Sequence, residues 1–486
     1  MKLELQPRPN QTLADQLFAA GVEFPCGGES ACGGCKVRVV EGDVPVTATM
    51  RDALAEDEIR DGWRLACCAS AAGRVVVEVE QWSLRVLVDA ASVPVEPRAG
   101  LGAVVDLGTT TLVAQVVDLA SGEVVRVETA LNPQARFGAD VMSRLQYDLH
   151  HPGELGRLIR ETLGRMLGGA PLGEVLVAGN TAMHHLFCML GVEPLTHAPF
   201  LSPTLDGCRF PAADLGWPGP AEFLPCLGGF VGSDLLCGIV ATRLDEQPEP
   251  HALFDIGTNG EVLVGCSQGI LCASTAAGPA FEGGRIGAGM RAGAGAIDSV
   301  HVRDGGLTCH VIGGGAARGV CGSGLVDAAA CGVELGWIRS NGRLVRPDQR
   351  LPLADGVALT QGDIRELQLA KGAMAAGLRM LGAGGVAKLY LAGAFGNYIR
   401  LPSARAIGLL PADLPVEPVG NTALRGARML LLAPSTRQAR LRKIAALTRH
   451  VELAADPDFQ YLYAEMMALA GANSRGDREK THPGPL

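Results

Sequence analysis

One short pattern occurs twice in the chain and restricts its fold more than any other feature. The segments AVVDLGTTTLVAQ (residues 103–115) and ALFDIGTNGEVLVG (residues 252–265) each run from an apolar stretch through Asp, Gly and Thr into a second apolar stretch. An apolar strand that ends in an acid, a glycine turn and a returning strand is typical of a β-hairpin. Either copy alone would fit an ordinary hairpin, but the repetition predicts a duplicated fold with two matching lobes.

The chemistry of these turns suits a phosphate group and a metal ion. Glycine lets backbone amides approach phosphate oxygens, threonine hydroxyls add donors, and a carboxylate can hold hydrated Mg²⁺. We therefore predict that ATP and Mg²⁺ bind between the lobes, with Asp106 and Asp255 positioning magnesium and water. The residues expected at the phosphates are Gly108, Thr109, Thr110, Gly257, Thr258 and Asn259.

Three further segments fit a nucleotide-binding domain. In VAKLYLAGAFGNYI (residues 386–399) an apolar strand enters a turn of small residues that suits the flat side of an adenosine. The residues expected there are Gly393, Ala394, Gly396 and Asn397. Residues 225–241 and 366–382 have the pattern of helices that connect the two lobes. Asp234, in the first of these, is a candidate for orienting the attacking water, and equally an ordinary acid at a helix N-terminus.

Together these segments resemble the superfamily of acetate and sugar kinases, actin and the heat-shock chaperone ATPases. Within the resemblance Asp106, Asp255 and Gly393 match the first phosphate, second phosphate and adenosine motifs. It implies an α/β two-lobed, actin-like ATPase domain made of duplicated ribonuclease H-like folds. We place the first lobe at residues 102–245 and the second at 246–472.

A separate motif near the N-terminus carries cysteines. PCGGESACGGCKVRV (residues 25–39) sets Cys26, Cys32 and Cys35 in a glycine-rich loop, and a fourth candidate, Cys67, follows in WRLACCAS. Three clustered thiolates and one distant thiolate are typical of an iron–sulfur site, and the C-x5-C-x2-C spacing differs by one residue from the plant-type ferredoxin spacing. Zinc also suits four cysteines, but it usually takes two close pairs, whereas one is present here.

Residues 1–81 resemble, over their whole length, the 2Fe-2S ferredoxin domain with its β-grasp (α+β) fold. MKLELQP alternates like a strand, TLADQLFAAG like a short amphipathic helix, and CKVRVVEGDV and GRVVVEVE like further strands. Within this resemblance RLAC assigns the fourth cluster ligand to Cys67, with the neighbouring Cys68 as the alternative. Residues 82–101 are predicted to be a linker and residues 473–486 a disordered tail.

Composition excludes several classes of partner. A net charge of −9 argues against nucleic acid. Since no run of about 18 apolar residues occurs and MKLELQPRPN lacks the pattern of a secretory signal, we predict a cytoplasmic protein that does not enter a membrane. The cysteines outside the N-terminal motif are expected to be buried thiols. The adjacent His184 and His185 point in different directions on a helix and are not expected to bind one metal ion together.

An electron carrier fused to an ATPase indicates that nucleotide chemistry controls electron transfer. Over residues 1–472 the combination resembles the reductive activators of corrinoid enzymes, and GNTAMHHL, GPAFEGG, VCGSGLVD and ELAADPDFQ look like signatures of that family. The resemblance implies ATP-dependent reduction of cob(II)alamin to cob(I)alamin in the corrinoid protein of a methyltransferase system, with a reduced ferredoxin or a flavin reductase as electron donor. It allows a homodimer, although larger relatives carry a further domain where this chain has only the linker.

Two other functions stay open at this point. An activator of a radical dehydratase or aryl reductase also pairs such an ATPase with iron–sulfur chemistry, but it usually holds a 4Fe-4S cluster at a dimer interface. A binding module could instead sense redox state and nucleotide without hydrolysis. A small-molecule kinase is a weaker third alternative, because its reaction would not use an iron–sulfur cluster.

Overall fold

The computed structural model describes residues 2–6, 12–19, 35–71, 73–79, 93–138, 140–257, 260–382 and 385–469. Cys26, Cys32, Thr258, Asn259, most of the predicted linker and the predicted tail lie outside these residues. No helix of the described residues is long and apolar enough to cross a membrane.

The N-terminal domain is a four-stranded sheet with a helix beside it. The strand order is β1-β4-β2-β3, and every described pair in it is antiparallel. Leu13 and Leu17, one helical turn apart, are fully buried in one cluster with Val75 and Val77, which alternate along their strand. The elements are β1 (Lys2–Leu5), α1 (Leu13–Ala19), β2 (Lys36–Glu41), α2 (Ala48–Ala53), α3 (Glu56–Arg60), β3 (Trp63–Leu65), η1 (Ala66–Cys68) and β4 (Val75–Glu78).

The first lobe is built on a six-stranded sheet of order β7-β6-β5-β8-β10-β9. Its first three strands form an antiparallel meander, and β8 then pairs in parallel with β5 on the opposite side. The elements are β5 (Leu101–Leu107), β6 (Thr111–Asp118), β7 (Val124–Leu131), η2 (Pro133–Phe137), α4 (Val141–His150), α5 (Glu154–Leu167), β8 (Val175–Gly179), α6 (Thr181–Cys188), η3 (Glu193–Leu195), β9 (Cys208–Phe210), α7 (Ala212–Leu215), β10 (Ala221–Phe223), α8 (Ser233–Thr242) and η4 (Leu244–Glu246).

The second lobe repeats this topology in the sheet β20-β19-β11-β12-β13-β21, where β11 lies between antiparallel β12 and parallel β19. Its elements are β11 (His251–Ile256), β12 (Gly260–Cys266), β13 (Gly269–Thr275), η5 (Pro279–Glu282), β14 (Ala296–Arg303), β15 (Gly306–Val311), β16 (Gly319–Val320), α9 (Gly322–Glu334), β17 (Arg350–Ala354), β18 (Val357–Thr360), α10 (Gln361–Met380), β19 (Leu389–Ala392), α11 (Gly393–Tyr398), α12 (Leu401–Ala406), β20 (Val416–Gly420), α13 (Thr422–Leu432), α14 (Pro434–Leu447), β21 (Thr448–His450), η7 (Leu453–Ala455) and α15 (Pro457–Met466). The duplicated two-lobed fold expected from the sequence is therefore present.

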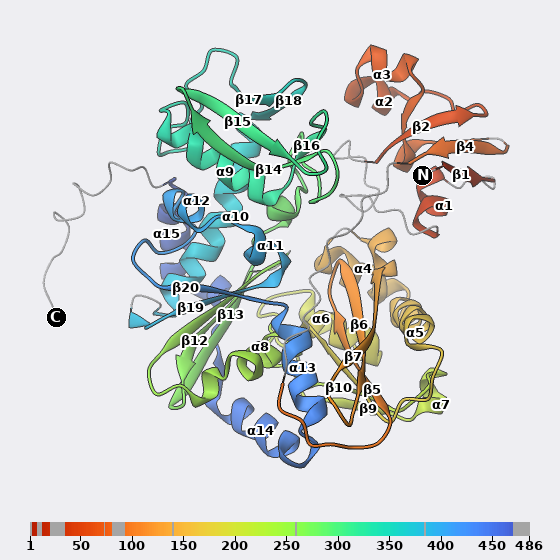
Figure 1. Cartoon of the computed structure of the whole chain (residues 1–486), viewed down its shortest axis with the longest axis vertical. Coiled ribbons are helices and arrows are strands. Elements are labelled where there is room, and N and C mark those ends of the chain that lie inside the picture. Colours follow the sequence, from red (N-terminus) through yellow and green to blue (C-terminus); the bar gives the residue numbers. More distant parts are fainter. Residues whose placement is uncertain are drawn as a thin grey trace, which may run out of the picture.

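Helices α8 and α13 join the two lobes (Figure 1). One buried cluster runs from the first sheet through both helices to the second sheet. A side chain on Gly426 of α13 would clash with the backbone oxygen of Cys237 of α8, so the two helix backbones lie directly against each other. The N-terminal domain lies next to the first lobe, where α1 contacts η2.

The prediction that residues 366–382 form the second connecting helix is wrong. That stretch lies almost wholly in α10, which packs within the second lobe against β12, β13 and α15. Helix α13, which contacts β5 and β8 of the first lobe, takes the connecting place. Apolar spacing shows that a helix is buried, but it does not show which sheet covers it.

Candidate functional site

A cavity of about 330 Å³ lies between the lobes, at the ends of their matching strands. Both glycine turns reach it, as the repeat in the sequence indicates. The predicted residues that line it are Asp106, Gly108, Thr109, Thr110, Asp234, Asp255, Gly257 and Gly393. Polar residues that line it and were not singled out from the sequence are Asn180, Glu261, Glu282, Arg291, Ser323 and Asn421.

Three aspartates share this cavity. Asp106 lies near the end of β5, Asp255 near the end of β11, and Asp234 in the first turn of α8. Burial raises the pKa of Asp106 to about 6, against the opposing effect of a hydrogen bond from Asn421. Burial, together with repulsion by the other two carboxylates, raises the pKa of Asp255 to about 7.

The pKa of Asp234 also rises to about 7, mainly through burial; a hydrogen bond from the Leu235 amide opposes the shift and the charge of Asp106 adds to it. A fourth acid, Glu261, lies opposite Asp255 in the β11–β12 register, and burial raises its pKa well above the ordinary value. Carboxyl groups that repel one another in a buried site are neutralised by protons or by a cation. Oxygen donors of this kind suit Mg²⁺, so the residues present fit a magnesium–nucleotide site.

Two asparagines hold the first turn in place. Asn421 donates from Nδ2 to Asp106 Oδ2 at 2.9 Å, and Asn180 donates to Thr109 Oγ1 at 2.9 Å. Each also caps a helix, since Asn421 Oδ1 accepts from the first turn of α13 and Asn180 Oδ1 from that of α6. The tetrapeptide GNTA occurs at both places, residues 179–182 and 420–423, so the sequence did contain a signal for them.

The first turn also reaches across the cleft. The Gly108 amide donates to the Thr111 carbonyl at 3.1 Å, which closes the turn tightly. Thr110 Oγ1 lies 3.5 Å from Glu282 Oε2, a residue of the second lobe. A ligand at this turn therefore contacts groups whose positions depend on both lobes.

The predicted adenosine turn is a short helix, α11, instead of an open turn. Gly393 begins it with φ +84°, and a Cβ there would meet Asp255 Oδ1 at 2.7 Å. Gly396 packs against Leu391, and the described residues of α11 that line the cavity are Gly393, Phe395 and Tyr398. For Ala394 and Asn397 the structure describes the backbone within α11 only.

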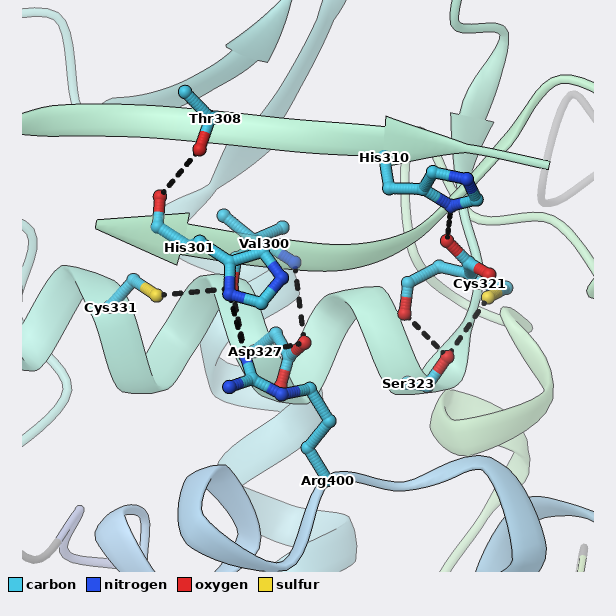
Figure 2. A network of polar contacts seen from close by, with 10 residues as sticks. Val300, His301, Thr308, His310, Cys321, Ser323, Asp327, Cys331 and Arg400 are labelled. Carbon is cyan, nitrogen blue, oxygen red and sulfur yellow. Dashed lines mark hydrogen bonds and ion pairs between the residues drawn. The ribbon is translucent and has the colours of Figure 1, made fainter. Parts of the chain in front are cut away.

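Helix α9 brings its N-terminus, with Gly322 and Ser323, to the same cavity. Figure 2 shows how it is fixed: Ser323 Oγ donates to the Asp298 carbonyl at 2.8 Å. One turn further, the buried Asp327 Oδ2 accepts from the Val300 amide at 3.2 Å and lies 3.4 Å from Arg400 Nη1. These bonds tie α9 to β14 and to the residue that precedes α12, so its N-terminal amides face the cleft from a held position.

The N-terminal domain brings two of the predicted cluster cysteines together. Because Lys36 pairs with Leu65 between β2 and β3, Cys35 and Cys67 lie at the same end of the sheet, and their Sγ atoms are 3.0 Å apart. Two thiolates on one tetrahedral iron, each bonded at about 2.3 Å, lie about 3.8 Å apart, so a small shift accommodates the metal. The thiol of Cys68 also interacts with Cys67, and it contacts Thr47 Oγ1 at 3.7 Å and the Leu65 carbonyl at 3.6 Å.

Comparisons with known proteins agree with this arrangement. Family models match in three successive parts: a 2Fe-2S iron-sulfur cluster binding domain over residues 2–72, the RACo middle region over 101–247, and the C-terminal domain of RACo, the ASKHA domain, over 249–477. The fold and the site thus define a protein that joins a 2Fe-2S ferredoxin domain to an ASKHA domain, the class of sugar kinases and actin. The ferredoxin match supports a 2Fe-2S cluster over the zinc alternative.

Whole-chain relatives are more specific. The corrinoid activation enzyme RamQ of Eubacterium limosum is 35% identical over 423 residues, which span 76% of this chain and 70% of that protein. The [Co(II) methylated amine-specific corrinoid protein] reductase of Methanosarcina barkeri is 28% identical over 69% of this chain and 70% of its own. A solved reductive activator for a corrinoid, iron-sulfur protein has a TM-score of 0.68 at 25% identity and covers 96% of this chain and 97% of its own. The chain belongs to the family of reductive activators of corrinoid proteins.

Proposed function

We propose that this protein uses ATP and Mg²⁺ to drive the one-electron reduction of cob(II)alamin to cob(I)alamin in the corrinoid protein of a methyltransferase system, in the cytoplasm. When bound, the 2Fe-2S cluster supplies a one-electron carrier, which a reduced ferredoxin or a flavin reductase would recharge. The observation that carries the proposal is that one chain places two glycine turns and five acids around a single cleft and joins them to a ferredoxin domain.

Each group of residues has a task in this proposal. Asp106 and Asp255 hold hydrated magnesium, and Asp234 orients the attacking water from the start of α8. The backbone of Gly108 and the hydroxyls of Thr109 and Thr110 bind phosphate oxygens. Gly257, Thr258 and Asn259 of the second turn also bind phosphate oxygens. The adenosine is held at α11, through Gly393, Ala394, Gly396 and Asn397. Cys26, Cys32, Cys35 and Cys67 hold the cluster.

The energetics explain why a nucleotide is needed. Plant-type 2Fe-2S centres lie near −400 mV, and an acceptor about 200 mV lower makes a one-electron step unfavourable by roughly 5 kcal/mol. That is between three and four powers of ten in an equilibrium constant. A ligand shifts an equilibrium only by its different affinity for the two states, so ATP must bind much better to the lobe arrangement in which the corrinoid protein accepts the electron.

Asp106→Ala tests the proposal. The variant should keep the visible absorption of the cluster, because Asp106 is not one of the proposed cluster ligands, and should lose ATP-dependent reduction of the corrinoid. Asp413→Ala, which removes an exposed carboxylate outside the cavity, is the matched control and should behave as the unmodified protein. Full ATP-dependent reduction by Asp106→Ala would refute the coupling.

A further inference from the structure

Three side chains that commonly bind metals meet in the first lobe, and none of them lines the cleft. His184 and Cys188 lie on α6, and Cys208 is the first residue of β9. Their potential ligand atoms all lie within 4.8 Å of one another. We infer that His184, Cys188 and Cys208 form a second metal site, which holds a thiophilic divalent cation such as Zn²⁺.

The spacing and the distances suit a tetrahedral ion. His184 and Cys188 are four residues apart, so they lie on one face of α6, one turn from each other. His184 Nε2 is 3.6 Å from Cys208 Sγ. In a tetrahedral site with a metal–nitrogen bond of about 2.0–2.1 Å and a metal–sulfur bond of about 2.3 Å, these two atoms lie about 3.6 Å apart.

The two neighbouring histidines differ in a way that selects His184. His185 has a partner on each ring nitrogen: Nδ1 lies 2.8 Å from the Gly191 carbonyl and Nε2 lies 2.7 Å from Ser202 Oγ. His184 is fully buried, its Nδ1 has no hydrogen-bond partner among the described residues, and its Nε2 contacts only the sulfur of Cys208. Hydrogen bonding accounts for the position of His185, whereas the imidazole of His184 is directed at the thiol cluster.

Burial and charge fit the same ion. The imidazole packs on the Phe223 ring at 4.8 Å between centroids, while Cys188 and Cys208 are partly exposed. The inner side of the site is therefore closed, and its outer side leaves a fourth position for water. Two thiolates and a neutral imidazole balance a 2+ charge with the soft donors that zinc prefers.

Arg160 is a cation near Cys188 and Cys208, and other contacts fix its side chain. Arg160 donates from Nε to the Phe187 carbonyl at 2.8 Å, and its guanidinium lies over the Phe187 and Phe210 rings at 5.2 and 4.9 Å. These contacts fix the guanidinium beside the aromatic rings.

The position of the site gives it a structural task. Cys188 ends α6 and Cys208 begins β9, so a shared ion would clip together both ends of the connecting segment 189–207. Binding to the folded state alone stabilises that state by mass action. Helix α6 begins next to Asn180, which contacts Thr109 in the cleft, so the clip would also hold the helix that supports the first turn.

The test uses the full-length protein with its iron–sulfur cluster, purified without oxygen, incubated with Zn²⁺ and desalted. Zinc and iron are counted per chain, and the zinc X-ray absorption fine structure is recorded. We expect about one zinc per chain, with two sulfur neighbours at about 2.3 Å and one nitrogen at about 2.0–2.1 Å. Zinc in the ferredoxin site would instead show sulfur neighbours only.

Cys188→Ser and Cys208→Ser should each lower zinc occupancy at least about tenfold while iron content stays unchanged. Cys309→Ser is the matched control, since Cys309 is another partly exposed cysteine, on β15. Equal zinc in the unmodified protein and both variants would overturn the inference. A Cys188–Cys208 disulfide in the unmodified protein prepared without oxygen would also overturn it, because that bond consumes both donors.

A measurement on the unmodified chain covers variants that fail to fold. Iodoacetamide labelling of Cys208, followed by mass spectrometry, should slow at least about tenfold when Zn²⁺ is added, because a metal-bound thiolate is not free to react. Labelling of Cys309 should not change. Equal labelling of Cys208 with and without Zn²⁺ would overturn the inference.

Discussion

Replacing Gly393 by alanine is expected to damage the nucleotide site without affecting the iron–sulfur domain. Gly393 has φ +84°, and an added Cβ would lie 2.7 Å from Asp255 Oδ1 and 2.8 Å from the Ile256 carbonyl oxygen. These separations are roughly 0.7 Å shorter than an ordinary contact. Either α11 must move away from β11, or the carboxylate of Asp255 must turn out of its place.

The loss of folding free energy expected for Gly393→Ala has two parts. A left-handed backbone costs a non-glycine residue about 1–2 kcal/mol. Overpacking against a backbone that cannot yield adds about 1–3 kcal/mol. Gly382→Ala isolates the first part, because Gly382 also has φ +84° and no described atom would lie within 4 Å of its Cβ.

Two assays read out the difference. In thermal denaturation both variants should lose stability, Gly393→Ala more than Gly382→Ala. In calorimetric titration with Mg-ATP, Gly393→Ala should bind about 10–100-fold more weakly, since a displacement near 1 Å of a positioning group costs on that order. Gly382→Ala should bind as the unmodified protein does. Unchanged Mg-ATP affinity in Gly393→Ala would refute the assignment of this glycine to the site.

Three further outcomes are expected. Cys67→Ser should lose most of the visible cluster absorption and Cys68→Ser should keep it; the reverse result would move the fourth ligand to Cys68. Without nucleotide and Mg²⁺, the thermal midpoint should fall as the pH rises from about 5 to about 8, because carboxyl groups with raised pKa values bind more protons in the folded than in the unfolded chain. Adding Mg²⁺ should stabilise the protein most at the upper end of this range. A Mg²⁺ effect that is independent of pH would contradict the assignment of Mg²⁺ binding to the carboxylates of the cleft. Asn421→Ala removes the hydrogen bond that stabilises the charged form of Asp106, so the pKa of Asp106 should rise. Mg²⁺ binding, measured by titration, should then need a higher pH. An unchanged pH profile of Mg²⁺ binding would count against this role of Asn421.

The parts of the site that the sequence revealed are those carried by a repeated local pattern. Asp106 and Asp255 both follow an apolar strand and precede a glycine, and a duplicated topology brings such ends together. Asn180 and Asn421 were missed although GNTA is also repeated, because an asparagine before a helix is explained well enough as a cap. Glu282 lies in the signature GPAFEGG, but the signature does not say which of its residues faces the cleft. Arg291 reaches the cleft from a segment without regular strand or helix periodicity, so no pattern marks it.

In the fold too, features set by local patterns were predictable and features set by tertiary contacts were not. Element types follow from periodicity, but the sheet that covers a buried helix does not. Periodicity alone therefore assigns to α10 the connecting place that α13 occupies. The cysteines outside the N-terminal motif were expected to be buried thiols, whereas Cys188 and Cys208 are partly exposed and lie close together. Nineteen residues of chain separate α6 from β9, and only the tertiary fold brings their ends into contact.

The central claim is that nucleotide occupancy of the cleft drives an electron from the ferredoxin domain to a corrinoid. It is tested most directly by mixing the iron-loaded protein, an oxidised corrinoid protein and a reductant without oxygen, and following the cobalt absorption before and after addition of Mg-ATP. The account predicts that cob(I)alamin accumulates only when protein, reductant and Mg-ATP are all present. Formation of cob(I)alamin at the same rate and to the same extent without Mg-ATP would contradict it.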